Sequence, residues 1–289
     1  MSEGVRTYYG QSVLKQPTWK PFIPAYFYLG GLAAGSSLLA AGASATRDRR
    51  LRRVASVTAL AAICGGALAL VADLGRPDRF HHMLRVFRPS SPMNLGSWVL
   101  VGYGPAAGVA AFSELTGIGR PVGRVATWTA AAMAPALATY TGVLVSDTAV
   151  PAWHGARHTM PALFAASAAA SAGGLAAALL PDSTAARRYA VGGALGEVVV
   201  SSQQHRRLEP DVARAYQQER ARSLTRLAAT ASLGGALLIG IGAPRRTLAR
   251  IGGLSIAIGA IAERFAVMEA GRASAADPEA TIAPQRRQS

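Results

Sequence analysis

The sequence predicts an all-α integral membrane fold with eight transmembrane helices, and two observations support this prediction. Hydrophobic residues make up 51% of the 289 residues and charged residues only 16%, and the charges cluster between long apolar stretches. Because one helical crossing of the bilayer core needs about 20 apolar residues, stretches of that length indicate spans. Eight stretches qualify, near residues 23–46, 54–74, 95–115, 125–148, 160–180, 188–204, 225–243 and 248–268.

The composition of these stretches favours closely packed helices over barrel strands. They are rich in Ala, Gly and Leu, as in residues 31–35, and small side chains let helices approach closely in a membrane. Residues 1–22 are polar and aromatic without a cleavable signal pattern, which predicts an interfacial segment. Residues 271–289 have no apolar stripe, which predicts a disordered tail.

The charges predict a membrane topology rather than a nucleic-acid partner. Eight crossings place both termini on one face, side A, with the loops near 75–94, 149–159 and 205–224. The other face, side B, has short loops dense in arginine, namely Arg47, Arg49, Arg50, Arg52, Arg53, Arg120, Arg124, Arg187, Arg188, Arg245, Arg246 and Arg250. Arginines at helix ends suit phospholipid headgroups, so the formal charge of +15 does not indicate nucleic acid. The flank of the first span favours a cytoplasmic side B, whereas the total basic count favours a cytoplasmic side A.

Aromatic residues gather at the side A ends of the first and fourth spans. An interfacial aromatic belt explains Trp19 and Tyr28. Tyr140 lies deeper, about seven residues before Asp147 and so roughly 10 Å inside the end of its helix. A phenol at that depth needs a hydrogen-bond partner. A lipid-soluble quinone fits this need, because its ring stacks on aromatic side chains and its carbonyl accepts a hydrogen bond.

The segment between the second and third spans is too polar for lipid and too aromatic for a plain linker. Asp73 ends the second span close to Arg76, a spacing that allows a carboxylate–guanidinium pair at the membrane boundary. This pair is either a structural clasp between two helices or part of a proton relay. His81 and His82 fit headgroup-facing residues better than metal ligands, because adjacent helical side chains diverge.

Ionisable residues also occur in the sixth and eighth spans. Glu197 lies within the sixth span, where a carboxylate belongs either to a proton path or to a polar contact between helices. Near the end of the eighth span, Glu263 and Arg264 predict an interfacial or interhelical ion pair.

The remaining motifs argue against a metal cofactor in this chain. The five histidines fall in loops or at helix ends, whereas a transmembrane haem needs histidines within the spans. Cys64 is the single cysteine, so no iron–sulphur cluster can be ligated by cysteines of this chain. We therefore expect no haem, no cluster and no metal site here, and any metal centres in a partner.

Several short motifs in the first 160 residues together resemble the NrfD/PsrC family of polysulphide reductase-like membrane subunits. The matching stretches are residues 8–10, 17–19, 26–35, 73–77 with 79–80, 88–93, 96–98, 140–144 and 151–153. The resemblance implies two four-helix bundles, an N-terminal one over residues 23–158 that holds a quinone site and a C-terminal one over residues 159–270. It also implies an iron–sulphur, ferredoxin-like subunit on side A, which connects to a molybdopterin catalytic subunit.

The resemblance also implies roles for particular residues. The quinone-site tyrosine of the family maps onto Tyr140. We expect Tyr140, Asp73 and Arg76 to be the catalytic residues, and Ser97 and Trp98 of the 96–98 motif to contact the quinone as well. Where a polysulphide reductase has quinone-contacting Asn and His on the first helix, this chain has Ile23 and Tyr26. We expect Tyr26 to take over that hydrogen bond.

These features lead to one main hypothesis and two alternatives. The main hypothesis is a quinone-reactive anchor in a prokaryotic plasma membrane, which exchanges electrons between its iron–sulphur partner and menaquinone or ubiquinone. The first alternative is a purely structural anchor, which predicts that no quinone co-purifies. The second is a transporter, which is disfavoured because the break at Pro135 in the fourth span has no counterpart in the second half.

Overall fold

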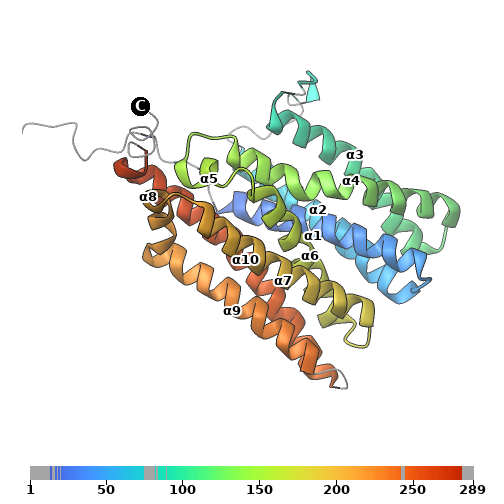
Figure 1. Cartoon of the computed structure of the whole chain (residues 1–289). Helices are drawn as coiled ribbons and strands as arrows, with labels where there is room; N and C mark the ends of the chain where they lie inside the picture. The colour runs from blue at the N-terminus through green and yellow to red at the C-terminus, as the bar shows by residue number, and fades with distance from the viewer. Residues whose placement is uncertain are drawn as a thin grey trace, which may run out of the picture.

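The computed structural model of the chain describes residues 14, 17, 19, 21–74, 82, 84–88, 90–241 and 245–281, and their regular structure is entirely helical (Figure 1). A long helix stands at each predicted span. These helices are α1 (Phe22–Ala45), α2 (Arg49–Asp73), α3 (Pro92–Thr116), α4 (Arg120–Ser146), α6 (Met160–Leu179), α7 (Thr184–Arg207), α9 (Glu219–Ile241) and α10 (Arg246–Ala276).

Seven of these helices are long and apolar enough to cross a membrane, which indicates a multi-pass membrane protein. The exception among the eight long helices is α7, which has 24 residues and carries Arg187, Arg188 and Glu197 within its length. Several helices begin before the apolar stretch. For example, α2 starts at Arg49 because Asp48 caps it, accepting a hydrogen bond of 3.0 Å from the backbone N–H of Leu51.

The helices pack in two groups that α1, α4 and α6 join. In the first group, α1 contacts α2, α3 contacts both α2 and α4, and α4 returns to α1. In the second, α6 contacts α7, α7 contacts α9, and α10 contacts both α9 and α6. Small residues bring these helices together. A Cβ at Gly35 of α1 would overlap the backbone of Ala168 in α6, and a Cβ at Gly173 of α6 would overlap Ala190 in α7.

Successive long helices alternate in direction, so their connections lie at two ends of the molecule (Figure 1). Side A, as defined above, has the short elements α5 (Pro151–Gly155), α8 (Pro210–Ala213) and the 3₁₀ helix η2 (Arg214–Gln217). Side B has the tight turns between α1 and α2 and between α3 and α4.

The C-terminal part differs from the expectation of disorder from residue 271 onward. Helix α10 continues to Ala276, and residues 278–281 are also helical. This part of α10 packs on α5: Gly271 lies against the Trp153 ring, and the Ser274 hydroxyl accepts a hydrogen bond of 3.2 Å from the Ala152 N–H. The sequence has no apolar stripe here because small residues make this contact. Residues 282–289 lie outside the described residues.

Candidate functional site

Tyr140 lies in the side A half of α4, and its hydroxyl is buried. Its ring lies against Gly96 of α3, so closely that a methyl group at Gly96 would overlap it. The hydroxyl oxygen is buried and has no hydrogen-bond partner among the described residues. Leaving a buried hydroxyl unpaired costs on the order of 1–3 kcal/mol. The site therefore suits a ligand that supplies an acceptor or donor to this phenol.

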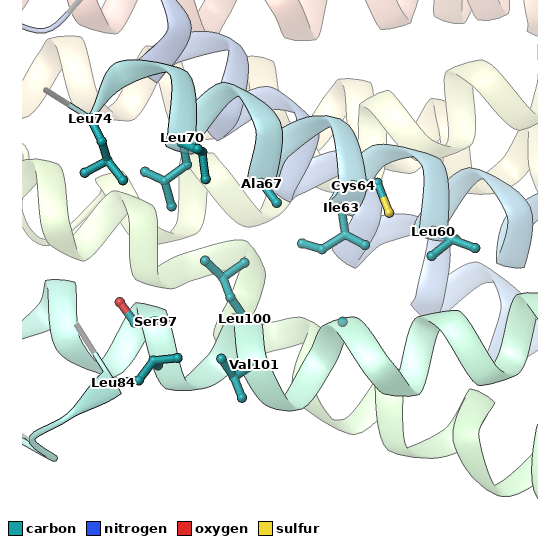
Figure 2. Close-up of a pocket in the computed structure, with 12 residues that line it drawn as sticks. Leu60, Ile63, Cys64, Ala67, Leu70, Leu74, Leu84, Ser97, Leu100 and Val101 are labelled. Atoms are coloured by element: carbon teal, nitrogen blue, oxygen red, sulfur yellow. The ribbon is translucent and has the colours of Figure 1, made fainter. Parts of the chain in front are cut away.

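An apolar groove of about 340 Å³ lies between α2 and α3 (Figure 2). We call it the α2–α3 groove. It is lined by Leu60, Ile63, Cys64, Ala67, Leu70, Val71, Leu74, Leu84, Ser97, Leu100, Val101 and Gly104. Figure 2 shows Ser97 and Leu84 facing Leu70 and Leu74 at one end, with Cys64 and Leu60 toward the other.

The groove and the tyrosine are connected through shared side chains. Leu70 and Leu100 line the groove and also pack against the same core cluster as Tyr140. Ser97 follows Gly96 directly in α3, and its hydroxyl donates a hydrogen bond of 3.1 Å to the Met93 carbonyl. An apolar cavity with a few polar groups nearby is a common form of a small-molecule site.

Asp73 is the last residue of α2, at the side A end of the groove. One of its carboxylate oxygens is buried without a hydrogen-bond partner in the described part of the chain. The next residue, Leu74, lines the groove. Arg76, the predicted partner of Asp73, lies outside the described residues, as does His81.

The other predicted quinone contacts do not line the groove. Ile23 and Tyr26 of α1 are buried, with 8% and 3% of their surface exposed, in the core cluster against which Tyr140 packs. Trp98 is 37% exposed, and its ring meets Phe87 edge to face with centroids 5.9 Å apart. Neighbouring helical residues such as Ser97 and Trp98 point in different directions, which explains why only Ser97 faces the groove.

Sequence reasoning did not single out the apolar walls of the groove. Leu60, Ile63 and Leu100 read as ordinary span residues, because any of them could face lipid, a helix or a ligand. Cys64 also lines the groove and is exposed. The alternation of exposed and buried positions depends on how α2 and α3 rotate about their axes, which composition does not specify.

A second set of polar side chains is buried in the group formed by α6, α7, α9 and α10. Glu197 accepts a hydrogen bond of 3.1 Å from the Ser232 hydroxyl, and Glu263 accepts one of 3.0 Å from Ser201. Arg264 donates a hydrogen bond of 2.9 Å to the Phe164 carbonyl, and its guanidinium carbon lies 3.7 Å from the centre of the Phe164 ring.

The predicted interfacial or interhelical ion pair of Glu263 and Arg264 is wrong. No ion pair within 4.0 Å joins either residue to another described residue. The two consecutive side chains leave α10 in different directions, so they do not pair with each other. The Arg264 Nε and Nη1 atoms and one Glu197 oxygen are buried without hydrogen-bond partners among the described residues.

Comparison with known proteins identifies the family. The chain is 31% identical over 106 residues to a selenate reductase subunit of Mesobacillus selenatarsenatis, a match that covers 36% of this chain and 24% of that protein. The chain thus spans about a quarter of the length of that relative. Residues 12–196, which include α1 to α4 and the α2–α3 groove, match the family described as polysulphide reductase, NrfD. The chain therefore belongs to the NrfD polysulphide reductase family.

Proposed function

We propose that this chain is the quinone-reactive membrane subunit of a respiratory reductase. The observation that carries the proposal is the buried Tyr140 hydroxyl, unpaired in the described part of the chain, together with an apolar groove of about 340 Å³ whose Leu70 and Leu100 pack on the same core cluster as Tyr140. A quinone has the matching parts, since its carbonyl accepts a hydrogen bond and its isoprenoid tail is apolar. The tail would occupy the α2–α3 groove and the ring would lie toward side A.

Quinone chemistry exchanges two electrons together with two protons, and the chain's own residues would manage the protons. The Tyr140 hydroxyl donates a hydrogen bond to the quinone carbonyl and orients the ring. Asp73 stands at the end of α2 with a buried carboxylate oxygen, where it can hold a proton near the ring. Gly96 leaves the space in which the Tyr140 ring lies.

The same proposal includes the partners and the location. The family is described as polysulphide reductase, and the relative from Mesobacillus selenatarsenatis is named as one of the subunits of a selenate reductase. We propose an iron–sulphur subunit that docks on side A and links this chain to a molybdopterin catalytic subunit. The complex would lie in a prokaryotic plasma membrane and use menaquinone or ubiquinone.

The proposal also takes α7 as an eighth crossing and the two helix groups as two four-helix bundles. The 24 residues of α7 extend about 36 Å, which is enough for a bilayer core of roughly 30 Å. Two of its polar residues in the side A half face protein, since Glu197 and Gln204 are 2% and 1% exposed. Burial of these side chains between helices supports a crossing in spite of the lower hydropathy.

Substitution of Tyr140 by Phe tests the quinone site in the purified complex. We expect quinone-linked turnover at subsaturating quinone to fall by about fivefold, the effect of one lost hydrogen bond. Reduction of a water-soluble dye by the partner subunits should be unchanged. Tyr189→Phe is the matched control, because its hydroxyl donates to the Gly35 carbonyl at 3.3 Å, away from the groove.

Substitution of Asp73 by Asn tests the proton step separately. We expect quinone-linked turnover to fall on the order of 100-fold, as for loss of a general acid or base, with quinone binding retained. If both Tyr140→Phe and Asp73→Asn keep full quinone-linked turnover, this site is not where quinone reacts. If, in addition, no quinone co-purifies, the chain is a structural anchor.

A further inference from the structure

The side B end of α1 to α4 encloses a second hollow that is lined with arginines. Its volume is about 280 Å³, and it lies between the α1–α2 turn and the α3–α4 turn. Arg47, Arg49, Arg52, Arg120 and Arg124 line it against a single acidic residue, Glu114. We call this hollow the arginine pocket.

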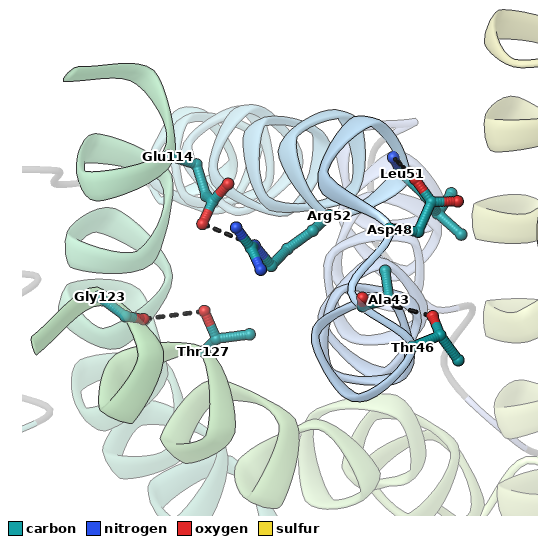
Figure 3. A network of polar contacts seen from close by, with 8 residues as sticks. All are labelled: Ala43, Thr46, Asp48, Leu51, Arg52, Glu114, Gly123 and Thr127. Carbon is teal, nitrogen blue, oxygen red and sulfur yellow. Dashed lines mark hydrogen bonds and ion pairs between the residues drawn. The ribbon is translucent and has the colours of Figure 1, made fainter. Parts of the chain in front are cut away.

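The one carboxylate in the arginine pocket is already paired. Arg52 Nε donates to Glu114 at 2.7 Å, and Figure 3 shows Arg52 reaching from α2 to Glu114 of α3. The other four arginines have no carboxylate within 4.0 Å among the described residues. A concentration of unneutralised guanidinium groups around a hollow favours an anion.

Arg47 has a left-handed backbone conformation, which glycine adopts more readily than any other residue. Its φ is 62°, and it ends α1 in a Schellman motif, with the Asp48 N–H donating to the Ala43 carbonyl at 2.9 Å and the Arg47 N–H donating to the Ser44 carbonyl at 3.3 Å. A left-handed residue with a Cβ is strained. The Arg47 side chain lines the pocket, and a role for its guanidinium there gives a reason for an arginine at this strained position.

The backbone adds to the positive potential at this pocket. Helix α4 begins beside the pocket, and no side chain caps its first turn, where Gly119 is the N-cap. The first N–H groups of a helix have no carbonyl partner within it, so they and the positive end of the α4 dipole lie at the same helix end as Arg120.

A neighbouring hollow at the same end provides a comparison. It has a volume of about 340 Å³ and is lined by Arg50, Arg246 and Arg250 together with Asp48 and Asp182. Arg246 pairs with Asp182 at 2.9 Å. Carboxylates nearly balance its arginines, so the excess of positive charge is a property of the arginine pocket rather than of every side B hollow.

Apolar side chains next to the arginine pocket indicate what kind of anion fits. Phe112 and Leu115 of α3 and Val122 and Val125 of α4 are exposed, and each lies within two residues of a pocket-lining residue of its own helix. A phosphate group at the pocket and acyl chains along these helices match the two parts of a phospholipid. We propose that the arginine pocket binds the phosphodiester headgroup of an anionic membrane lipid.

Lipid titration of the full chain by native mass spectrometry tests this proposal. The probes are dioleoylphosphatidylglycerol, dioleoylphosphatidylcholine and inorganic phosphate. We expect one phosphatidylglycerol to bind at least about tenfold more tightly than phosphatidylcholine, because only the former has net negative charge. Arg47→Gly and Arg124→Gln should each weaken phosphatidylglycerol binding by about fivefold.

Two variants keep the test decisive. Arg250→Gln removes an arginine of the neighbouring hollow, whose charges nearly balance, and should leave binding unchanged. Arg47→Gly places the preferred residue in the left-handed position, so its thermal unfolding midpoint should equal or exceed that of the wild type. Equal binding of the two lipids, an equal loss in Arg250→Gln, or binding of inorganic phosphate with the same arginine dependence would overturn the proposal.

Discussion

Gly96 determines where the Tyr140 ring can lie, because α3 has no side chain at the point that the ring occupies. At the scale of single residues, the candidate site thus depends on the lack of a side chain at Gly96 as much as on the Tyr140 hydroxyl. The tyrosine supplies the hydroxyl, and the glycine keeps that hydroxyl at the buried position where no described protein group meets it.

Gly96→Ala is therefore expected to displace the Tyr140 ring. A misplacement of about 1 Å can reduce turnover by up to about 100-fold, so quinone-linked turnover of the purified complex should fall while dye-linked activity persists. Gly42→Ala is the matched control, since a Cβ there has nothing within 4 Å, and it should stabilise α1 by about 0.5–1 kcal/mol. Unchanged turnover in Gly96→Ala would show that the ring position does not matter.

At the scale of elements, α7 places polar residues at successive turns of one face. Glu197, Ser201 and His205 are spaced four residues apart, and the His205 ring bonds the Ser201 carbonyl at 2.7 Å and meets the Tyr216 ring of η2 at 4.4 Å. Burial lowers the pKa of His205 below its usual value of 6.5, and the hydrogen bond to Ser201 opposes that shift. Burial also raises the pKa of Tyr216, with Glu263 as a further cause.

This histidine predicts a pH dependence of stability. Because its folded pKa is depressed, the unfolded chain takes up the proton first, and stability falls as the pH drops below about 6.5. One proton limits the slope to about 1.4 kcal/mol per pH unit. Thermal unfolding in detergent between pH 7.5 and 5.5 should show a shallower decline in His205→Gln than in the wild type. The exposed His158 provides the control variant His158→Gln, and an identical decline in all three proteins would contradict the prediction.

The helices could be predicted from the sequence, whereas the contacts between them could not. Apolar length placed the eight long helices, and seven of them are apolar enough to cross a bilayer, which sets the length of a span. The depth of Tyr140 indicated a phenol in need of a partner, and its hydroxyl is indeed buried without one among the described residues. The partners of Arg264 and the walls of the α2–α3 groove depend on helix rotation, and similar Ala, Leu and Gly residues on every face give no signal of it.

At the scale of the whole molecule, the topology depends on α7. If α7 crosses the bilayer, the α6–α7 turn and the α7–α9 connection lie on opposite membrane faces, as the alternation of the helices requires. If it does not, α9 and α10 cross the bilayer in the opposite directions to those of the eight-crossing topology.

Cysteine labelling distinguishes these topologies. In a Cys64→Ala background, Asp182→Cys and Gln218→Cys should react with a membrane-impermeant maleimide from opposite faces of sealed vesicles. Asp182 is a suitable position because its side chain is 64% exposed, and a surface ion pair contributes little to stability. Ile118→Cys, in the α3–α4 turn, should label from the same face as Asp182→Cys. Labelling of Asp182→Cys and Gln218→Cys from one face would exclude the eighth crossing.

The α2–α3 groove has exposed side chains along its length, with Val101 45% exposed and Cys64 also at the surface. A ligand that enters there comes sideways from the hydrocarbon phase and never passes through bulk water. Its relevant concentration is the mole fraction among lipids, so diluting the membrane with extra lipid should slow turnover even when the amount of quinone per volume is constant. Detergent tails belong to the same phase, and they compete for the groove as soon as the bilayer is removed.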